Sequence, residues 1–555
     1  MSAGAAWNQT TVSEPAPSTS LTPSSRSDLL AGLAGERFDL VVIGGGITGA
    51  GVARDAARRG LRVALVEKDD FAAGTSSRSS KLIHGGLRYL AMGEVGMVRE
   101  TARERQAVHQ MAPHLAEPCW MVVPARNRAG LMKVRAGIST YEKLGAIDDS
   151  DRHLSWDQGD LAEEEPSLGR DEYPWACAYR EYMTDDARLV LAVLRDAVGA
   201  GSVVASRLPV VDVIWEDGRI DGVVAACEVS GDQVEIRADA VVNATGPWVE
   251  RLAQFEEEAA TDRLHPSKGI HIVVDAARLP VRNLVIMDTP DKRSVFVLPR
   301  GDVVAIGTTD TSYQGKRLLW PEIELADVEY LLHPLKHYFD VEPPGLDDVV
   351  AAWSGVRPLV AQKGKDATEI SRKEEVWVGS GGMITVAGGK LTGFRTMAMT
   401  VLDFVAERLG RTLAPGPGPD PIPGGDLSSN LDNHAAAVAA ANGVEQAVAG
   451  RMVRLYGSET SQVLALGQEP MVPGGRVVAG EVAWAVRVDG ALTLEDLIYR
   501  RTRAAWYTPA ERDDLLAPAA SLMGDLLGWD EARTAAEIDA VQGRFASEMQ
   551  FKVDA

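Results

Sequence analysis

The residues with the clearest chemical signature are three glycines near the start of the chain. Gly44, Gly46 and Gly49 have the spacing G-x-G-x-x-G and follow the short apolar run 38–43, which is rich in β-branched residues. An Ala-rich amphipathic segment comes next, so the pattern predicts a strand, a tight turn and a helix. In this arrangement Gly44 permits the turn, Gly46 lets a pyrophosphate approach the backbone, and Gly49 lets the helix pack closely on the strand. The helix N-terminus supplies free N–H groups and a partial positive charge for the phosphates.

An acidic residue completes this pattern. A second apolar run, 61–66, ends at Glu67, about 20 residues after the first glycine, where the ribose of a dinucleotide finds its hydrogen-bond acceptor. Strand, helix and terminal acid together predict a site for an adenine dinucleotide. They do not separate FAD from NAD, because both cofactors use the same turn and the same acid.

A loop dense in hydroxyl groups follows this acid. We expect it to contact the cofactor, although a solvated loop could have the same composition, through Thr75, Ser76, Ser77 and Lys81. The next residues, His84, Gly85 and Gly86, would allow close approach of the backbone.

Two later turns follow apolar runs and complete the predicted cofactor site. The first contains Thr245 and Gly246, where a late strand would return to the adenine end. The second is Gly388-Gly389-Lys390-Leu391-Thr392, which opens a helix reaching about residue 409. Its N–H groups could stabilise negative charge on a reduced flavin; a plain strand-to-helix turn is the alternative. Because these turns would hold one cofactor from both ends, we expect permanently bound FAD.

The composition excludes several classes of function. The chain has 555 residues and a formal net charge of -22, which argues against nucleic acid as a partner. Cys119, Cys177 and Cys227 lie far apart without metal-type spacing, so we expect no metal site and a reducing compartment. No apolar run approaches the roughly 18 residues of a membrane span, and the N-terminus does not resemble a signal peptide. We expect a cytoplasmic protein; contact with the inner face of the cytoplasmic membrane stays open.

The chain resembles the FAD-dependent, aerobic-type glycerol-3-phosphate dehydrogenases, which oxidise sn-glycerol 3-phosphate to dihydroxyacetone phosphate. The matching stretches run in order along the sequence: DLVVIGGGITGAGVARDAARRG, TSSRSSKLIHGGLRYL, DDARLVLAVLRDA, VNATGPWV, KGIHIVV, IGTTDT, SGVRPL and GGKLT. The resemblance implies a hydride transfer to flavin N5, with electrons passed on to a quinone or another acceptor. It also implies a homodimer.

The segment order, read with this resemblance, predicts an α/β architecture (α+β overall). Closely spaced strand patterns within 265–310 predict an antiparallel sheet, and helical patterns fill the C-terminal region beyond a proline- and glycine-rich stretch. We expect a Rossmann-like FAD-binding domain of the glutathione-reductase type, an inserted substrate domain and a C-terminal helical domain. The expected boundaries are a disordered tail at 1–35, an FAD-binding domain at 36–110, 185–260 and 350–410, a substrate-binding domain at 111–184 and 261–349, a linker at 411–429, and a helical domain at 430–555.

A dianionic phosphate favours arginine, whose planar fork binds it through two hydrogen bonds. The resemblance places Arg88, Arg357 and Lys390 at the substrate phosphate, with Arg372 as a weaker addition. In a chain this acidic, positive charge should be gathered at such a site.

The hydroxyl proton of the substrate needs a base, and we favour His271, because an imidazole titrates near neutral pH. His84 competes for this role, and a strand histidine satisfied by a backbone partner is the alternative. Tyr89 could hydrogen-bond the substrate oxygen as it becomes a carbonyl. The expected catalytic set is His271, Arg357, Lys390 and Tyr89.

Three other functions compete with this prediction. An oxidase would pass electrons from the flavin to oxygen, and the sequence does not decide between oxygen and quinone. An amine oxidase on the same fold would need an arginine for a carboxylate. A flavin-containing binding or sensor protein would lack the basic residues, which are present here.

Overall fold

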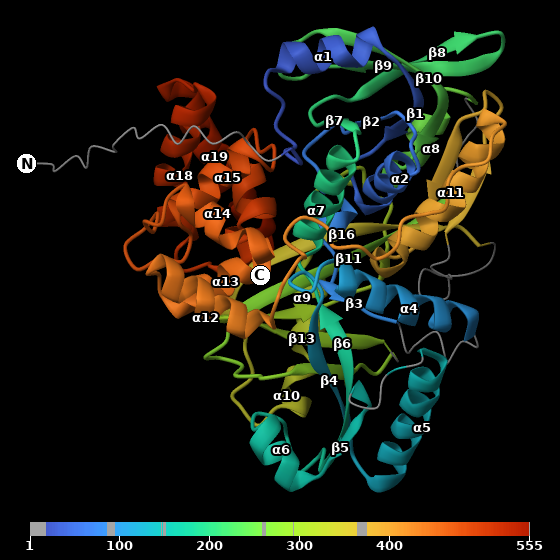
Figure 1. The fold of residues 1–555 in the computed structure, drawn as a ribbon. Helices are drawn as coiled ribbons and strands as arrows, with labels where there is room; N and C mark the ends of the chain where they lie inside the picture. Colours follow the sequence, from blue (N-terminus) through green and yellow to red (C-terminus); the bar gives the residue numbers. More distant parts are fainter. Residues whose placement is uncertain are drawn as a thin grey trace, which may run out of the picture.

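The computed structural model describes residues 18–85, 95–145, 147, 151–257, 262–291, 293–362 and 374–553. Two sheets and a group of C-terminal helices make up this part of the chain (Figure 1).

The first sheet carries the glycine-rich turn. Its strands run in the order β17-β18-β10-β1-β2-β7, and β9 pairs with β10 and with β8. The central pairs are parallel, as predicted from the short apolar runs. The strand bounds are β1 Arg37–Ile43, β2 Val63–Val66, β7 Val203–Ala205, β8 Val210–Glu216, β9 Arg219–Ala226, β10 Gln233–Asn243, β17 Glu375–Val378 and β18 Ile384–Ala387.

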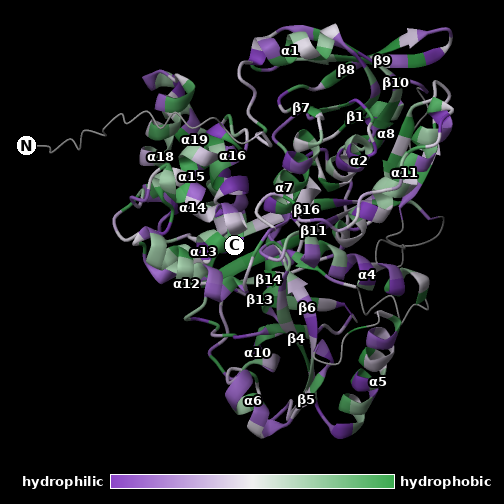
Figure 2. Cartoon of the chain, viewed as in Figure 1, coloured by the Kyte–Doolittle hydropathy of each residue, from purple (hydrophilic) through white to green (hydrophobic). Residues whose placement is uncertain are grey.

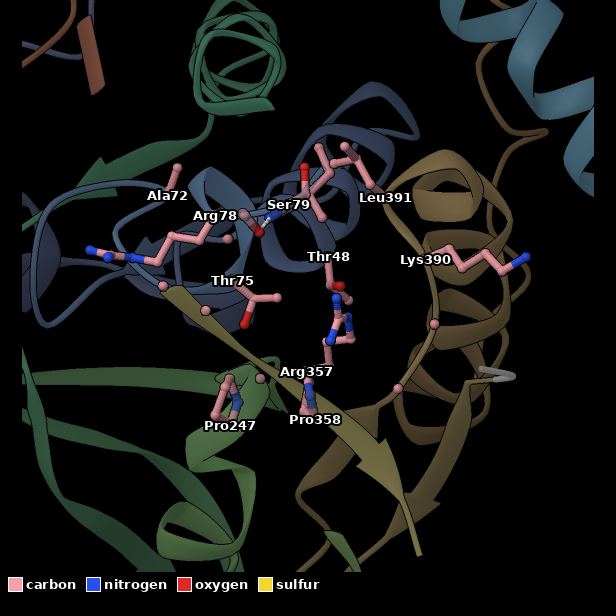
Figure 3. A pocket seen from close by; sticks show the side chains of 18 of the residues that line it. Thr48, Ala72, Thr75, Arg78, Ser79, Pro247, Arg357, Pro358, Lys390 and Leu391 are labelled. Carbon is pink, nitrogen blue, oxygen red and sulfur yellow. Dashed lines mark hydrogen bonds between the residues drawn. The ribbon is translucent and has the colours of Figure 1, made fainter. Parts of the chain in front are cut away.

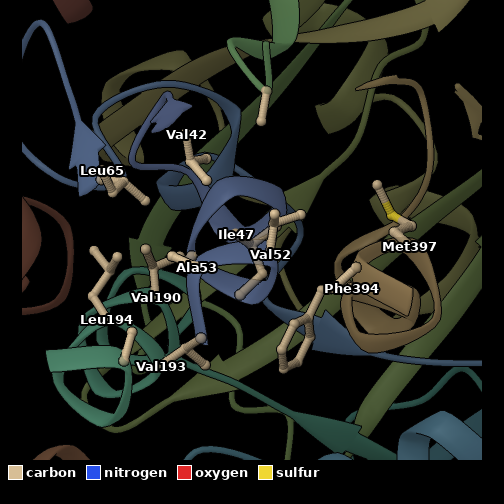
Figure 4. Packing of buried hydrophobic residues seen from close by; sticks show 14 of the residues in the cluster. Val42, Ile47, Val52, Ala53, Leu65, Val190, Val193, Leu194, Phe394 and Met397 are labelled. Atoms are coloured by element: carbon tan, nitrogen blue, oxygen red, sulfur yellow. The ribbon is translucent and has the colours of Figure 1, made fainter. Parts of the chain in front are cut away.

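Helix α2 (Ile47–Arg58) lies at the centre of the core beside this sheet. Figure 4 shows it between α7 (Asp186–Gly199) and α11 (Phe394–Leu409). Small residues on α2 permit this close packing: a Cβ at Gly51 would lie 2.9 Å from Cδ2 of Phe394. The glycine turn is therefore held by helices that come from three distant parts of the chain. Helix α8 (Val249–Ala253) also contacts this sheet, at β10 and β18.

The second sheet is mostly antiparallel, as predicted. Its order is β15-β11-β14-β13-β12-β4-β6-β3, with β16 paired to β11 and β5 to β6. The pair β4 and β12 is parallel. The strands are β3 Leu82–Ile83, β4 Glu117–Ala125, β5 Leu154–Trp156, β6 Trp175–Met183, β11 Leu264–Asp275, β12 Leu284–Asp288, β13 Ser294–Arg300, β14 Val303–Gly307, β15 Thr311–Ser312 and β16 Val349–Val360.

One expected domain boundary is wrong. We expected residues from 350 onward to belong to the cofactor domain, but β16 pairs with β11 from Val349 to Val360. Long cross-strand pairing therefore places this segment in the antiparallel sheet. Only after it does the chain return to the parallel sheet, through β17 and β18.

Helices cover both faces of the second sheet. One face packs on α6 (Gln158–Glu164), α9 (Leu325–Leu332) and α10 (Leu335–Tyr338). The other packs on α4 (Val95–Met111), α5 (Arg128–Gly145) and the C-terminal helices. Figure 2 shows hydrophobic residues in the inner strands, and mixed hydrophilic and hydrophobic residues along the surface helices α5 and α6.

The C-terminal region is helical, as predicted, and residues between Ala435 and Val488 form a buried cluster of their own, whereas its later helices share a core with the second sheet. Its residues Trp506 and Leu497 belong to the same buried cluster as Trp353 of β16. The helices are α12 Leu431–Asn442, α13 Gln446–Tyr456, α14 Thr460–Ala465, α15 Ala479–Arg487, α16 Leu494–Asp496, a π-helical turn Leu497–Arg501, α17 Ala504–Tyr507, α18 Arg512–Leu527 and α19 Glu531–Glu548. Within the described ranges, none of the helices is both long enough and apolar enough to cross a membrane.

Residues 18–35 correct the expectation of a disordered tail up to residue 35. Helix α1 (Arg26–Gly35) begins after Ser25, whose side chain accepts a hydrogen bond from the Asp28 N–H. Leu21 is buried, and its N–H donates to the carbonyl of Val488 at 2.7 Å. The serines and threonines that suggested disorder instead serve as caps and hydrogen-bonding groups.

Candidate active site

A cavity of about 1090 Å³ lies between the two sheets. Its walls combine the turn after β1, the loop 72–80, the turns at 244–248 and 386–392, and residues 355–359 of β16. Figure 3 shows Arg357 near the middle of the site, with Thr75 close by and Lys390 and Leu391 on another wall. The cavity therefore joins the predicted cofactor turns to the predicted substrate residues.

The glycine turn has the geometry that a phosphate cradle needs. Gly44 has φ +112°, and a Cβ there would lie 2.6 Å from the carbonyl oxygen of Ala244. A Cβ on Gly49 would lie 1.9 Å from the Gly44 oxygen, so this residue serves helix packing and lies behind the cavity wall. Gly46 lines the cavity, where the Ser76 hydroxyl accepts a hydrogen bond from the neighbouring Ile47 N–H at 3.0 Å.

Glu67 lies in the cavity wall just after the end of β2. Its carboxylate accepts hydrogen bonds from the N–H groups of Gly45 at 2.6 Å and Asp69 at 2.8 Å. Burial raises the pKa of Glu67 to about 6, and these backbone hydrogen bonds oppose the rise. The carboxylate is thus fixed at the edge of the cavity.

Arg357 points into the cavity from β16 and is held by the chain after β14. It donates to the Thr308 hydroxyl at 2.9 Å and to the Thr309 carbonyl at 3.2 Å, and it lies 3.4 Å from the Asp310 carboxylate. A Cβ at Gly269 would lie 2.3 Å from one guanidinium nitrogen. The glycine on the neighbouring strand thus leaves room for the arginine.

The turn at 388–392 lies on another wall of the cavity. Gly388 and Gly389 have φ +79° and +81°, and the first helical residues form a short 3-10 turn, Leu391–Gly393, before α11. The Thr392 hydroxyl is 3.2 Å from both the N–H and the carbonyl of His84. This contact joins the predicted flavin turn to the end of the hydroxyl-rich loop.

Besides Gly49, three predicted cofactor contacts lie behind the cavity wall and are corrected here: Ser77, Lys81 and Gly85. The Lys81 ammonium is buried against both carboxylate oxygens of Asp186, at 2.9 Å each, and the backbone at Lys81 has φ +58°. A Cβ at Gly85 would lie 2.1 Å from the Tyr141 hydroxyl, so that glycine serves packing.

His271 is also buried, at the centre of the second sheet. Its ring stacks on Trp353 at 4.7 Å, and its Nε2 is 2.9 Å from the Ser80 hydroxyl. Ser80 lines the cavity, whereas His271 does not. Burial, with the positive charges of Lys81 and Arg357, lowers the pKa of His271 well below its ordinary value, so the imidazole is neutral.

Several predicted residues lie outside the described part of the chain: Gly86, Arg88, Tyr89 and Arg372. Conversely, the cavity includes Thr308, Asp310 and Arg293, to which we assigned no role. Arg293 donates to the Asp310 carbonyl at 2.9 Å. The only signal for it in the sequence is a basic residue at the start of a strand. Within the described ranges, no group of His, Cys, Asp or Glu could hold a metal ion.

Comparison with known proteins assigns the chain to a family. Residues 39–399 match the model of the FAD dependent oxidoreductases, and residues 420–534 match the C-terminal domain of alpha-glycerophosphate oxidase. The aerobic glycerol-3-phosphate dehydrogenase of Bacillus subtilis is 36% identical over 523 residues, which cover 91% of this chain and 94% of that protein. The protein of the same name from Staphylococcus epidermidis is 33% identical over 540 residues, covering 94% and 97%. The chain belongs to the aerobic glycerol-3-phosphate dehydrogenase family.

A solved structure of this family supports the fold assignment. The glycerol-3-phosphate dehydrogenase from Bacillus halodurans, complexed with FAD, superposes with a TM-score of 0.78 at 29% identity, covering 96% of this chain and 98% of that chain. The L-alpha-glycerophosphate oxidase from Mycoplasma pneumoniae, with FAD bound, shares the fold at 17% identity and a TM-score of 0.53.

FAD, the cofactor of this dehydrogenase family, fits the residues of the cavity. The backbone at Gly46 faces the cavity without a side chain in front of it. The carboxylate of Glu67, held by the Gly45 N–H, lies in the same wall and could accept a hydrogen bond from a ribose hydroxyl. At the other end, Gly388 and Gly389 expose the backbone beside Lys390. Gly44, Gly46, Glu67, Thr75, Ser76, Thr245, Gly246, Gly389, Leu391 and Thr392 would hold the cofactor.

Proposed function

We propose that this protein oxidises sn-glycerol 3-phosphate to dihydroxyacetone phosphate and passes the electrons to a quinone. The single observation that carries the proposal is the place of Arg357, which shares one cavity with the dinucleotide cradle. When bound, FAD supplies the hydride acceptor. The names of the relatives support the choice of substrate.

Arg357 binds the substrate phosphate in this proposal. Its guanidinium is partly balanced by Asp310 at 3.4 Å, so one arginine leaves a phosphate dianion incompletely neutralised. Lys390 lines the same cavity and contributes a second positive charge. Arg88 and Arg372 complete the proposed phosphate site.

The neutral His271 accepts the hydroxyl proton in this proposal. Its lowered pKa keeps the imidazole unprotonated at neutral pH, so its nitrogen can accept a proton, although less strongly than a free imidazole. Because Ser80 lies between His271 and the cavity, the serine hydroxyl is placed to pass the proton on. Tyr89 would hydrogen-bond the oxygen that becomes a carbonyl.

The turn Gly388–Thr392 supports the charge that develops during the reaction. Backbone N–H groups at the start of a helix favour a nearby anion. The two glycines with positive φ let these groups approach a ring closely.

Oxygen is the second candidate acceptor, because the C-terminal region matches a domain named after an oxidase. A quinone acceptor would bring the protein to the inner face of the cytoplasmic membrane. The two acceptors differ in product, since oxygen yields peroxide and a quinone yields a quinol.

Bleaching of the flavin absorbance tests the proposal directly. Without oxygen, glycerol 3-phosphate should bleach the purified yellow protein, whereas glycerol and glycine should not. A flavin that stays oxidised with glycerol 3-phosphate, or that is bleached by glycine, would contradict the substrate assignment. Adding a soluble quinone or oxygen to the bleached protein, and measuring quinol against peroxide, then identifies the acceptor.

A further inference from the structure

The loop at residues 69–81, here called the cavity loop, has two different sides. One side lines the cavity through Thr75, Ser76, Arg78, Ser79 and Ser80. The other side faces the C-terminal helices, which lie beside α7 in Figure 1. Three arginines of these helices reach the loop, and all three are at most 1% exposed: Arg500, Arg501 and Arg503.

The first contact grips the beginning of the loop at Asp70. Arg501 binds both carboxylate oxygens of Asp70, at 2.6 and 2.8 Å. The Nε of Arg500 donates to the same carboxylate, while its NH2 donates to Asp496 at 2.7 Å. A bidentate pair of this kind fixes orientation as well as distance.

The second contact grips the end of the loop through Asp186 at the start of α7. Arg503 donates to the Asp186 carboxylate at 2.8 Å and to the Ser77 carbonyl at 3.3 Å. The same carboxylate accepts from the N–H and hydroxyl of Ser79, at 3.1 and 2.7 Å, and from Lys81 at 2.9 Å. Asp186 therefore connects two loop residues, Ser79 and Lys81, to one arginine of the C-terminal domain.

An irregular backbone presents these arginines to the loop. Arg500 and Arg501 end the π-helical turn Leu497–Arg501, and Arg503 has φ +63°, in the left-handed region. Neither conformation is common for such residues, and both recur at functional sites. The chain thus departs from regular helix at the point where it meets the cavity loop.

The second contact holds Ser79, which is the residue next to Ser80 in the chain, and Ser80 contacts the proposed base. Ser80 stands between Ser79 and Lys81, and its hydroxyl is 2.9 Å from Nε2 of His271. We propose that the C-terminal domain positions the cavity loop for catalysis, with Arg503 as a positioning residue that acts through Asp186 on Ser80 and His271. This inference rests on the proposed function, because His271 is the base only in that reaction.

Stability alone does not account for this arrangement. Buried ion pairs contribute little net stability relative to apolar packing. In addition, the C-terminal helices are joined to α7 by another ion pair. Arg195 of α7 binds Glu459 of the C-terminal region at 2.6 and 2.7 Å, away from the cavity loop. This second interdomain pair offers a matched control.

The test compares Arg503→Met and Arg503→Lys with Glu459→Gln in the FAD-loaded protein. Amide hydrogen exchange over residues 69–81 measures the loop, and steady-state kinetics measure catalysis. Arg503→Met should exchange faster in the loop and lose about tenfold in kcat, which is about 1.4 kcal/mol of barrier. Its KM for glycerol 3-phosphate should change by less than about threefold, because Arg357 is held by other residues. Arg503→Lys should recover part of kcat, and Glu459→Gln should match the unaltered protein in both measurements.

Unchanged loop exchange in Arg503→Met, or an equal loss of kcat in Glu459→Gln, would overturn the inference. If Arg503→Met does not fold, Asp70→Asn serves as the second variant, because it breaks the first contact. Asp70→Asn should also show faster exchange in residues 69–81 and a lower kcat. Normal exchange and normal kcat in Asp70→Asn would then overturn the inference. If glycerol 3-phosphate fails to bleach the unaltered protein, the proposed function fails by itself. Hydrogen exchange then still decides whether Arg503 positions the loop.

Discussion

The guanidinium of Arg357 occupies the space where a side chain at Gly269 would begin. The two residues lie on neighbouring strands, and a Cβ at Gly269 would be 2.3 Å from the nearest arginine nitrogen. Strand β11 thus lacks a side chain at the one place where the adjacent strand must project a cation into the cavity.

Gly269→Ala should therefore disturb the phosphate site by displacing Arg357, although it removes none of the side chains that bind the phosphate. Displacing the arginine from Thr308 weakens a charge-assisted contact by about 1.5–3 kcal/mol, so KM for glycerol 3-phosphate should rise about 10- to 100-fold. Steady-state kinetics check this. Gly137→Ala is the control, because a Cβ there meets nothing within 4 Å. A KM near that of the control would contradict the packing role of Gly269.

Arg357→Ala should raise KM at least as much while leaving FAD bound. The arginine comes from β16, whereas Gly46 and Glu67 belong to the turn after β1 and the end of β2. The flavin absorbance per protein measures retention, and Arg357→Lys should restore only part of the affinity because lysine lacks the planar fork. Loss of flavin with normal substrate affinity would refute the phosphate assignment.

Substitutions at two glycines of the same turn, Gly46 and Gly49, should have different effects on FAD binding and on stability. Gly46→Leu should give a folded but colourless protein, because the nearest atom to a Cβ there is the Ser76 hydroxyl at 3.1 Å. Gly49→Ala should lower the unfolding midpoint as well, since its Cβ would lie 1.9 Å from a backbone oxygen. Absorbance and thermal unfolding separate the two effects. A yellow Gly46→Leu protein would be incompatible with pyrophosphate binding at this turn.

FAD affinity should fall as the pH drops through about 6. Glu67 has a pKa of about 6 in the cavity, and the ribose hydroxyls donate to its ionised form, so FAD binding lowers this pKa further. Protonation below pH 6 therefore competes with binding, whereas above that pH the carboxylate is already ionised. Titrating apo protein with FAD at pH 5 to 8 measures the effect. Glu67→Gln should bind more weakly and with a flat profile over the same range; a flat profile in the unaltered protein would exclude Glu67 as the titrating group.

The sequence predicts the parts of the site that depend on local pattern. The turn at Gly44–Gly49 and the acid at Glu67 follow from spacing, because strand, turn and helix are neighbours in the chain. The antiparallel sheet follows from closely spaced strand patterns. Local pattern thus identifies the cradle and the layers around it.

Contacts between distant segments could not be predicted in this way. Lys81 belongs to a hydroxyl-rich loop, yet its partner Asp186 lies far along the chain and draws it away from the cavity. The role of Gly269 depends on its strand neighbour β16, and local pattern does not predict which of the two sheets β16 joins. Residues 18–35 have the composition of a flexible tail, but Leu33 packs in the core beside the first sheet and the Leu21 N–H donates to the carbonyl of Val488.

This last contact has a consequence for synthesis on the ribosome. The Ser20 hydroxyl donates to the carbonyl of Arg487, 467 residues later in the chain, so this segment contacts one that is translated much later. Domains generally fold as they emerge, yet residues 18–22 cannot dock until the segment around Arg487 has been made. Residues 18–22 therefore reach their final place after most of the segments that lie between them and Arg487.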